Sequence, residues 1–145
     1  MQLRRVESRD VEAILAIQAV SPEIAQWTLW DYERVARGEM AGWVAEEAGL
    51  VSGFLIARQV VSDIEILNLA VRPEARRRGI GAALLAEAIE WSNAFRAEKA
   101  LLEVRSSNVP ALQFYERHHF QATGRRPRYY TAPADDALVL TLRLS

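Results

Sequence analysis

Apolar residues recur along this chain with two different spacings, and together the spacings predict an alternation of strands and helices. Segments rich in β-branched and aliphatic residues, such as 64–71, are strand-like. Segments with apolar residues three and four positions apart, such as the one containing Leu84, Leu85 and Ala88, are helical. The predicted strands cover residues 3–6, 42–46, 50–60, 64–71, 100–105, 120–126 and 138–142. A first helix follows Ser8 or Asp10 and is broken at Ser21, and further helices cover 28–37, 83–95 and 110–118. The order β-α-α-β-β-β-α-β-α-β-β indicates an α/β fold, a mixed sheet with helices on both faces.

A glycine-containing loop with three arginines connects the strand 64–71 to the helix 83–95. Glycines let a backbone approach a ligand closely, and the free N–H groups of a helix start attract anions. The loop lacks the Gly-Lys-Ser/Thr of a Walker loop and the third glycine of the dinucleotide fingerprint. It predicts a site for a di- or triphosphate group, and the alternative is a helix start with a solvated basic patch. The residues concerned are Arg76, Arg77, Arg78, Gly79, Ile80, Gly81 and Ala82.

The composition excludes several classes of partner and of catalytic group. The 145 residues suit a single domain, 1–145, and half of them are hydrophobic, which is enough for a core. The net charge of −1 gives no general attraction to nucleic acid or membranes, so we expect neither as a partner. Without cysteine there is no disulfide, thiolate metal site or cysteine nucleophile. The chain shows no signal peptide and no apolar run of about 18 residues, so we expect a cytoplasmic protein, and we expect a monomer.

Two further segments carry candidate catalytic groups. Alternation along the strand 100–105 places Leu102 and Val104 on one face and Glu103 on the other. This strand should lie beside the strand 64–71, because one helical crossover separates them. Glu103 then lies centrally, either as a general base or as the partner of Arg105 on a wet face. In the next helix Asn108 is a natural N-cap, and a lone tyrosine such as Tyr115 is most often a core residue.

These motifs resemble the GNAT superfamily of acetyl-CoA-dependent N-acetyltransferases. Arg76-x-x-Gly79-x-Gly81 resembles the family's signature loop, which holds the pyrophosphate of coenzyme A. The segment from Glu103 through Asn108 to Tyr115 resembles the second half of the GNAT site. It is most similar to the bacterial ribosomal-protein-alanine N-acetyltransferases, as is the run 125–130. The predicted element order is that of the GNAT fold, so the resemblance covers almost the whole chain.

The resemblance implies a role for each matched residue. Glu103 is the base that deprotonates the acceptor amine, Tyr115 protonates the departing thiolate, and Asn108 contacts coenzyme A. Acetyl-CoA is the cosubstrate, no metal is needed, and transfer is direct. The implied acceptor is the N-terminal α-amine, of alanine, in a ribosomal protein. Another amine (a lysine side chain, a small metabolite or other protein N-termini) and a non-catalytic acyl-CoA-binding module stay open. Backbone groups that face the pantetheine and the thioester oxygen are expected from Leu69, Ala70 and Val71.

Three details qualify this picture. His119 stands where the family usually has the glycine that ends the helix, which implies a strained left-handed residue. The pair His118-His119 lacks a third ligand, so we expect no metal site. The stretch 127–137, with Pro127 and Pro133, is expected to be a long loop, and we expect acceptor selectivity in this loop and in the loop around Trp27.

Overall fold

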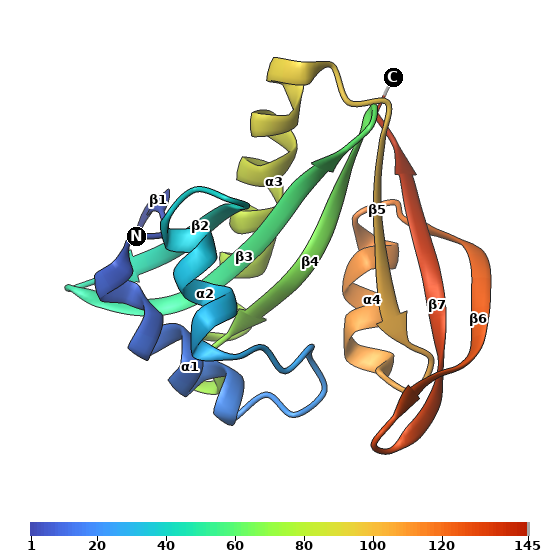
Figure 1. Ribbon diagram of the computed structural model, residues 1–145, viewed down its shortest axis with the longest axis horizontal. Coiled ribbons are helices and arrows are strands. Elements are labelled where there is room, and N and C mark those ends of the chain that lie inside the picture. Colours follow the sequence, from blue (N-terminus) through green and yellow to red (C-terminus); the bar gives the residue numbers. More distant parts are fainter. Residues whose placement is uncertain (145) are drawn as a thin grey trace.

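The computed structural model describes residues 1–144, and in this part of the chain seven strands form one sheet (Figure 1). Its order is β1-β2-β3-β4-β5-β7-β6, and all neighbours are antiparallel except β4 and β5. The strands are β1 (Gln2–Arg5), β2 (Ala41–Glu47), β3 (Leu50–Val60), β4 (Asp63–Val71), β5 (Lys99–Arg105), β6 (Gln121–Thr131) and β7 (Ala134–Arg143). The helices are α1 (Val11–Ala19), α2 (Leu29–Ala36), α3 (Ile80–Ser92) and α4 (Val109–Arg117), with short 3-10 turns at Ser8–Asp10, Pro73–Ala75 and Asn93–Phe95.

The predicted order of elements is confirmed, and so is the pairing of β5 with β4. One prediction is wrong. Residues 127–137 are not a long loop, because β6 continues to Thr131 and β7 begins at Ala134. The ladder accommodates Pro127, which has no N–H, at a register shift between Arg126 and Tyr130, and it leaves Pro133 in the turn. The segment is therefore a long hairpin.

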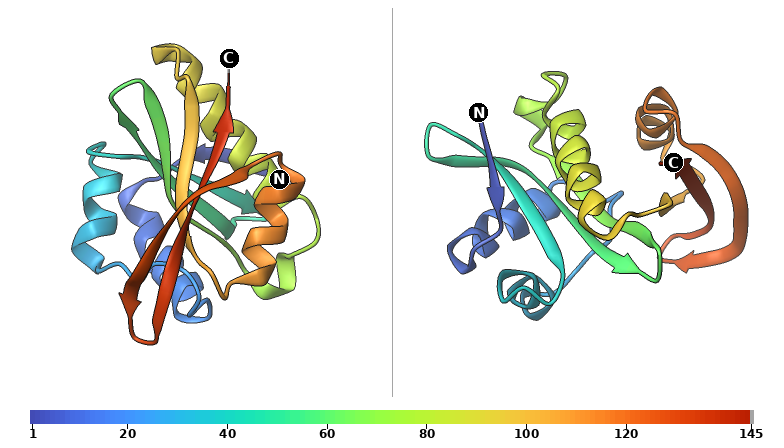
Figure 2. Two further views of the ribbon diagram at one scale, coloured as in Figure 1. Left: turned by 90° about the vertical axis from the view of Figure 1, so that its right-hand side faces the viewer. Right: turned by 90° about the horizontal axis from the view of Figure 1, so that it is seen from above.

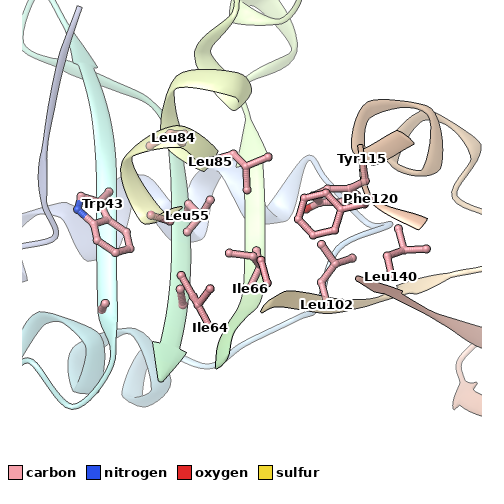
Figure 3. Packing of buried hydrophobic residues seen from close by; sticks show 14 of the residues in the cluster. Trp43, Leu55, Ile64, Ile66, Leu84, Leu85, Leu102, Tyr115, Phe120 and Leu140 are labelled. Atoms are coloured by element: carbon pink, nitrogen blue, oxygen red, sulfur yellow. The ribbon is translucent and has the colours of Figure 1, made fainter. Parts of the chain in front are cut away.

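Two hydrophobic cores lie on opposite faces of the sheet, because α3 and α4 cover one face and α1 and α2 cover the other (Figure 2). The core under α3 and α4 extends from Trp43 on β2 through Ile66 on β4 to Leu140 on β7 (Figure 3). This core connects the part of the sheet that ends at β4 with the part that begins at β5. Tyr115 and Phe120 fill its end beside Leu102.

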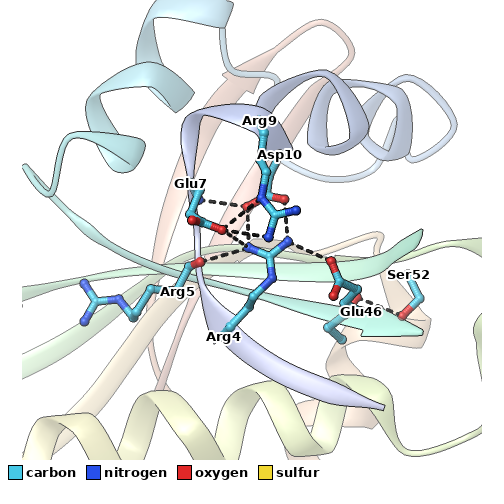
Figure 4. Close-up of polar contacts among 8 residues, drawn as sticks. Arg4, Arg5, Glu7, Arg9, Asp10, Glu46 and Ser52 are labelled. Carbon is cyan, nitrogen blue, oxygen red and sulfur yellow. Dashed lines mark hydrogen bonds and ion pairs between the residues drawn. The ribbon is translucent and has the colours of Figure 1, made fainter. Parts of the chain in front are cut away.

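The first strand is attached to the sheet by an ion cluster centred on Arg4 (Figure 4). The two terminal nitrogens of Arg4 contact Asp10 at 2.8 Å each, Glu46 at 2.9 Å and Glu7 at 3.0 Å. Asp10 is 3% exposed, and its carboxylate also accepts a bond from the Glu7 N–H. Burial favours the neutral form of Asp10, but its bonds to Arg4 and the Glu7 N–H outweigh this and lower the pKa of the carboxyl.

A β-bulge in β4 changes which side chains face each core. Ile56 pairs with Asn68, whereas the next residue of β3, Ala57, pairs with Ile66, so Leu67 is an extra residue. Before the bulge Ile64 and Ile66 face α3. The extra residue shifts the alternation by one position, so beyond it Asn68 and Ala70 face α1 and α2.

Candidate active site

A cleft opens where β4 and β5 part. The two strands pair only over Asp63–Glu65 and Lys99–Leu101, and beyond these residues they diverge (Figure 1). The cleft has a volume of about 570 Å³ and is lined by the loop before α2, the middle of β4, the end of β5, the first turns of α4 and the tip of the β6–β7 hairpin. Of the residues predicted from the sequence, it brings together Leu69, Glu103, Asn108 and Tyr115. Ala70, Val71 and the loop 76–82 do not line it.

The open edge of β4 presents backbone groups beside this cleft. The Arg72 N–H bonds to Ser52 O on β3, and in an antiparallel ladder this aims the N–H and C=O of Val71 and Leu69 away from β3. Ala70 differs, because the ladder turns its backbone groups toward Phe54. Arg76 Nε donates to Val71 O at 3.0 Å, and the Leu69 N–H donates to Asn68 Oδ1 at 3.1 Å. Of the three residues expected to contact a thioester through their backbone, Leu69 and Val71 therefore face the open edge and Ala70 does not.

The glycine loop ends in the N-terminus of α3, which begins at Ile80, three residues before the predicted start. The first backbone bond of the helix runs from Ala83 N to Gly79 O, so the N–H groups of Ile80, Gly81 and Ala82 are not used by the helix. Gly79 has φ +81°, a conformation that favours glycine. Gly81 leaves room for a neighbour, because a Cβ there would lie 3.3 Å from Phe114 Cε1 of α4 and would press on that ring. The unused N–H groups of Ile80, Gly81 and Ala82 are suited to binding a diphosphate.

The three arginines before this helix have different surroundings. Arg78 pairs with Glu47, and Arg76 bonds to Val71 O and lies 3.9 Å from Glu23. Within residues 1–144, Arg77 has neither an ion pair nor a side-chain hydrogen bond. Of the three arginines, Arg77 thus has the fewest polar contacts within the described residues.

Glu103 projects from β5 into the cleft on the face of α1 and α2, opposite Leu102 and Val104. One carboxylate oxygen, Oε1, lies 3.3 Å from Arg126 Nε. The other, Oε2, is buried and has no hydrogen-bond partner among the described residues. A buried carboxylate oxygen without a donor is costly, so this position is suited to a donor that arrives with a ligand.

Tyr115 approaches the same cleft from the opposite face of the sheet. Its ring packs against Phe114 and Phe120 in the core under α3 and α4. Its hydroxyl makes no hydrogen bond in the described part of the chain, and burial raises the pKa of this hydroxyl well above its ordinary value of about 10. The phenol therefore keeps its proton at neutral pH. The cleft passes through the sheet, with a carboxylate on one face and a phenol on the other.

Asn108 caps α4 as predicted, because its Oδ1 accepts a bond from the Ala111 N–H at 3.3 Å. The residue also lines the cleft, so capping and ligand contact are compatible. His119 has φ +73°, and the strained left-handed residue implied at the end of this helix is confirmed. His118 packs its ring against Phe114.

The hairpin forms a wall of the cleft through Tyr129 and Tyr130. The Arg105 guanidinium lies 4.3 Å from the centre of the Tyr130 ring and donates to Pro133 O at 2.8 Å. Asp135 accepts bonds from the hydroxyls of Ser106 and Ser107, and these bonds lower the pKa of its carboxyl to about 2. Burial, followed by the nearby charge of Glu103, raises the pKa of Tyr130. This side of the cleft is held by charged groups.

Residues 22–27 form a further wall of the cleft, and they include the loop around Trp27 in which acceptor selectivity is expected from the sequence. The sequence interpretation missed three buried polar side chains, Gln18 and Tyr32 behind that wall and Asn68, which also lines the cleft. Two of them left a signal. Gln18 interrupts the apolar face of the first helix, and Asn68 interrupts the most apolar strand. A buried polar residue in such a position needs a partner, and here the partners surround the cleft.

The described residues lack two features. In residues 1–144 no group of three or more His, Asp or Glu side chains is placed to hold a metal ion. None of the helices in that range combines the length and apolar character that crossing a bilayer requires.

Comparison with known proteins gives consistent matches. Residues 8–120 match the model of the acetyltransferase (GNAT) family. The chain is 30% identical over 145 residues to a protein of Bacillus subtilis (strain 168) that is provisionally named as a ribosomal protein bS18-alanine N-acetyltransferase. This match covers 99% of this chain and 95% of that one. It is 33% identical over 99 residues, 67% of each chain, to the ribosomal protein bS18-alanine N-acetyltransferase of Escherichia coli (strain K12).

Solved structures agree with this result. The crystal structure of the ribosomal-protein-S18-alanine N-acetyltransferase from Escherichia coli superposes with a TM-score of 0.84 at 26% identity, over 99% of this chain and 94% of that one. The crystal structure of Ard1 from Thermoplasma volcanium gives a TM-score of 0.87 at 26% identity, over 99% and 97%. The mixed seven-stranded sheet and its four helices are thus those of the GNAT fold, and the chain belongs to the GNAT family of acetyl-CoA-dependent N-acetyltransferases.

Proposed function

We propose that this N-acetyltransferase transfers the acetyl group of acetyl-CoA to the N-terminal α-amine of a protein, and that the acceptor is a ribosomal protein beginning with alanine. The observation that carries the proposal is the pair of groups in the cleft, the unpartnered Glu103 Oε2 and the protonated Tyr115 hydroxyl. The identity of the acceptor is supported by the relatives from Bacillus subtilis and Escherichia coli, which carry that activity in their names.

The two groups divide the proton transfers between them. An α-ammonium has a pKa of about 7.7–8.0, so at neutral pH the acceptor must lose a proton before it attacks. Glu103 Oε2 accepts that proton, directly or through a water molecule. The amine nitrogen forms a bond to the acetyl carbon, and a backbone N–H at the open edge of β4, other than that of Leu69, which donates to Asn68 Oδ1, stabilises the negative charge on the oxygen. As the carbon–sulfur bond breaks, the Tyr115 hydroxyl gives its proton to the sulfur.

The loop before α3 binds the cosubstrate in this proposal. The unused N–H groups of residues 80–82 and the arginines at 76–78 hold the pyrophosphate, and Asn108 contacts coenzyme A. These groups lie with α3 and α4, whereas Glu103 lies on the face of α1 and α2. Donor and acceptor thus enter from opposite faces of the sheet and meet in the cleft, an arrangement that suits direct transfer.

The test is a pair of peptides analysed by mass spectrometry. The first begins with alanine and contains an internal lysine, and the second is identical but has a blocked N-terminus. We expect one acetyl group on the α-amine of the first peptide and none on the second. Efficient labelling of lysine in the blocked peptide would replace the α-amine by a side-chain acceptor. Peptides that begin with serine, methionine or glutamate test the preference for alanine in the same assay.

Tyr115→Phe tests the acid in the same reaction. The ring and its packing are retained and only the proton donor is lost. We expect turnover to fall about 10²-fold or more, the usual scale for a positioned acid or base, with the affinity for acetyl-CoA unchanged. A variant that keeps wild-type turnover would make Tyr115 a core residue only.

A further inference from the structure

Three buried polar side chains from three different elements form a network behind one wall of the cleft. Gln18 on α1 is 7% exposed, Tyr32 on α2 is fully buried, and Asn68 on β4 is 5% exposed. The Tyr32 hydroxyl donates to Gln18 Oε1 at 2.5 Å and accepts a bond from Asn68 Nδ2 at 3.1 Å. All three side chains are neutral, so salt does not screen their contacts, and a lost bond leaves a buried polar group without a partner.

The network holds the loop between α1 and α2 by its backbone. Gln18 Nε2 donates to Trp27 O and Gln18 Oε1 accepts from Trp27 N, both at 2.9 Å. Asn68 Nδ2 donates to Ala25 O at 3.1 Å. These three bonds fix the segment 25–27, and residues 22–27 line the cleft on the side of Glu103. The wall that an acceptor touches is therefore shaped by Gln18 and Tyr32, which do not line the cleft, together with Asn68, which does.

The β-bulge in β4 allows Asn68 to contact Tyr32. Strict alternation from Ile64 and Ile66 would turn residue 68 toward α3, but the extra residue Leu67 turns Asn68 toward Tyr32 instead. Asn68 Oδ1 also accepts the Leu69 N–H, on the strand edge that borders the cleft. One side chain thus contacts both the acceptor wall and the edge of β4.

We propose that Tyr32 is a positioning residue, which acts through Gln18 and Asn68 to hold residues 25–27 in the conformation that receives the acceptor. The proposal rests on the proposed function, because it concerns the acceptor side of the same cleft. A wall ordered in advance lowers the entropy lost when a peptide binds. Loosening the wall therefore weakens acceptor binding and leaves the cosubstrate site and the proton transfers intact.

Tyr32→Phe tests this, because it removes only the hydroxyl. We expect KM for the alanine peptide to rise about 10-fold, the equivalent of losing one or two net hydrogen bonds. We expect kcat and the dissociation constant of acetyl-CoA to change less than twofold. The Trp27 amide, which donates to Gln18, should exchange with solvent faster by hydrogen-exchange mass spectrometry or NMR, a measurement that does not depend on activity. Gln18→Met, which removes three bonds of the network, should have a larger effect on both quantities.

The matched control is Ile14→Val. Ile14 is fully buried on α1 in the same core as Tyr32, and loss of its methyl group lowers stability modestly without touching the network. It should leave KM and Trp27 exchange unchanged. If Ile14→Val raises KM as much as Tyr32→Phe does, or if Tyr32→Phe leaves KM unchanged in an active enzyme, the positioning role is overturned. A wild-type protein that is inert toward every α-amine instead overturns the proposed function, and in that case Trp27 exchange still decides whether Tyr32 orders the wall.

Discussion

Arginine is used in two opposite ways in this molecule. The Arg4 side chain is only 16% exposed, and three carboxylates lie within 3.0 Å of its terminal nitrogens. The arginines at 76–78 are exposed, and each has at most one carboxylate partner. The first region commits its cation to folding, whereas the second keeps its charge available for an anionic ligand. The difference predicts which substitutions damage stability and which damage binding.

Asp10→Asn should have the largest effect, and the effect should be on stability. Removing one partner from a buried ion pair costs about 3 kcal/mol or more, because the remaining charge stays buried. The folded pKa of Asp10 is lowered, so its ionised form contributes stability above its unfolded pKa of about 3.9, and this contribution is lost as pH falls through the folded pKa. Urea unfolding should show a gap between wild type and variant that is widest near pH 7 and narrows below about pH 4. Acetyl-CoA affinity at pH 7 should not change.

Neutralising Arg76, Arg77 and Arg78 together, each to Gln, should give the reverse result. At about 1 kcal/mol for each exposed cation, acetyl-CoA binding should weaken about 10²-fold and its salt dependence should flatten. The urea midpoint should stay close to that of wild type, because surface substitutions usually change stability by less than about 0.5 kcal/mol. Isothermal titration at two salt concentrations measures the effect. Unchanged affinity and an unchanged salt slope would make the run a solvated surface only.

The single substitutions refine the comparison within the loop. Arg77→Gln should weaken acetyl-CoA about fivefold and Arg78→Gln about twofold, because Arg78 must leave Glu47 before it contacts a phosphate. Glu47→Gln frees Arg78 and should tighten binding about twofold. Equal effects of Arg77→Gln and Arg78→Gln would mean that the pairing with Glu47 does not matter for binding.

A last effect, on stability alone, concerns a residue outside both regions. His119 has φ +73° at the end of α4, where glycine is not strained. His119→Gly should stabilise the protein by about 1 kcal/mol, which corresponds to a rise of roughly 3 °C in Tm. Calorimetry measures the shift, and Gln113→Gly in the middle of α4 is the matched control, which should destabilise. A lower Tm for His119→Gly would mean that the contacts of the His119 side chain stabilise the protein by more than the strain costs.

Local patterns in the sequence predicted the parts of the site that depend on neighbouring residues. The loop before α3, the cap at Asn108 and the alternation along β5 each follow from a few adjacent side chains. The bulge at Leu67 was not predictable in this way, because it is set by the register between β3 and β4. The contact of Asn68 with Tyr32 depends on that register.

The hairpin shows a second limit. Pro127 and Pro133 suggested a loop, because proline removes a ladder bond. In the folded protein Arg128 N donates to Asp136 Oδ1, and Arg125 pairs with the same carboxylate. Contacts across the hairpin thus replace the lost ladder bonds, and a pattern read along one strand cannot show them.

The most direct test of the account is the pH–rate profile of Glu103→Gln. Glutamine retains the shape of Glu103 but cannot accept the proton of the acceptor ammonium. With the alanine peptide, we predict that the variant is slow at pH 7 and regains rate as pH rises past the pKa of the peptide amine, about 8, while the wild type is already active at neutral pH. Superimposable profiles for the two enzymes would contradict the assignment of Glu103 as the base.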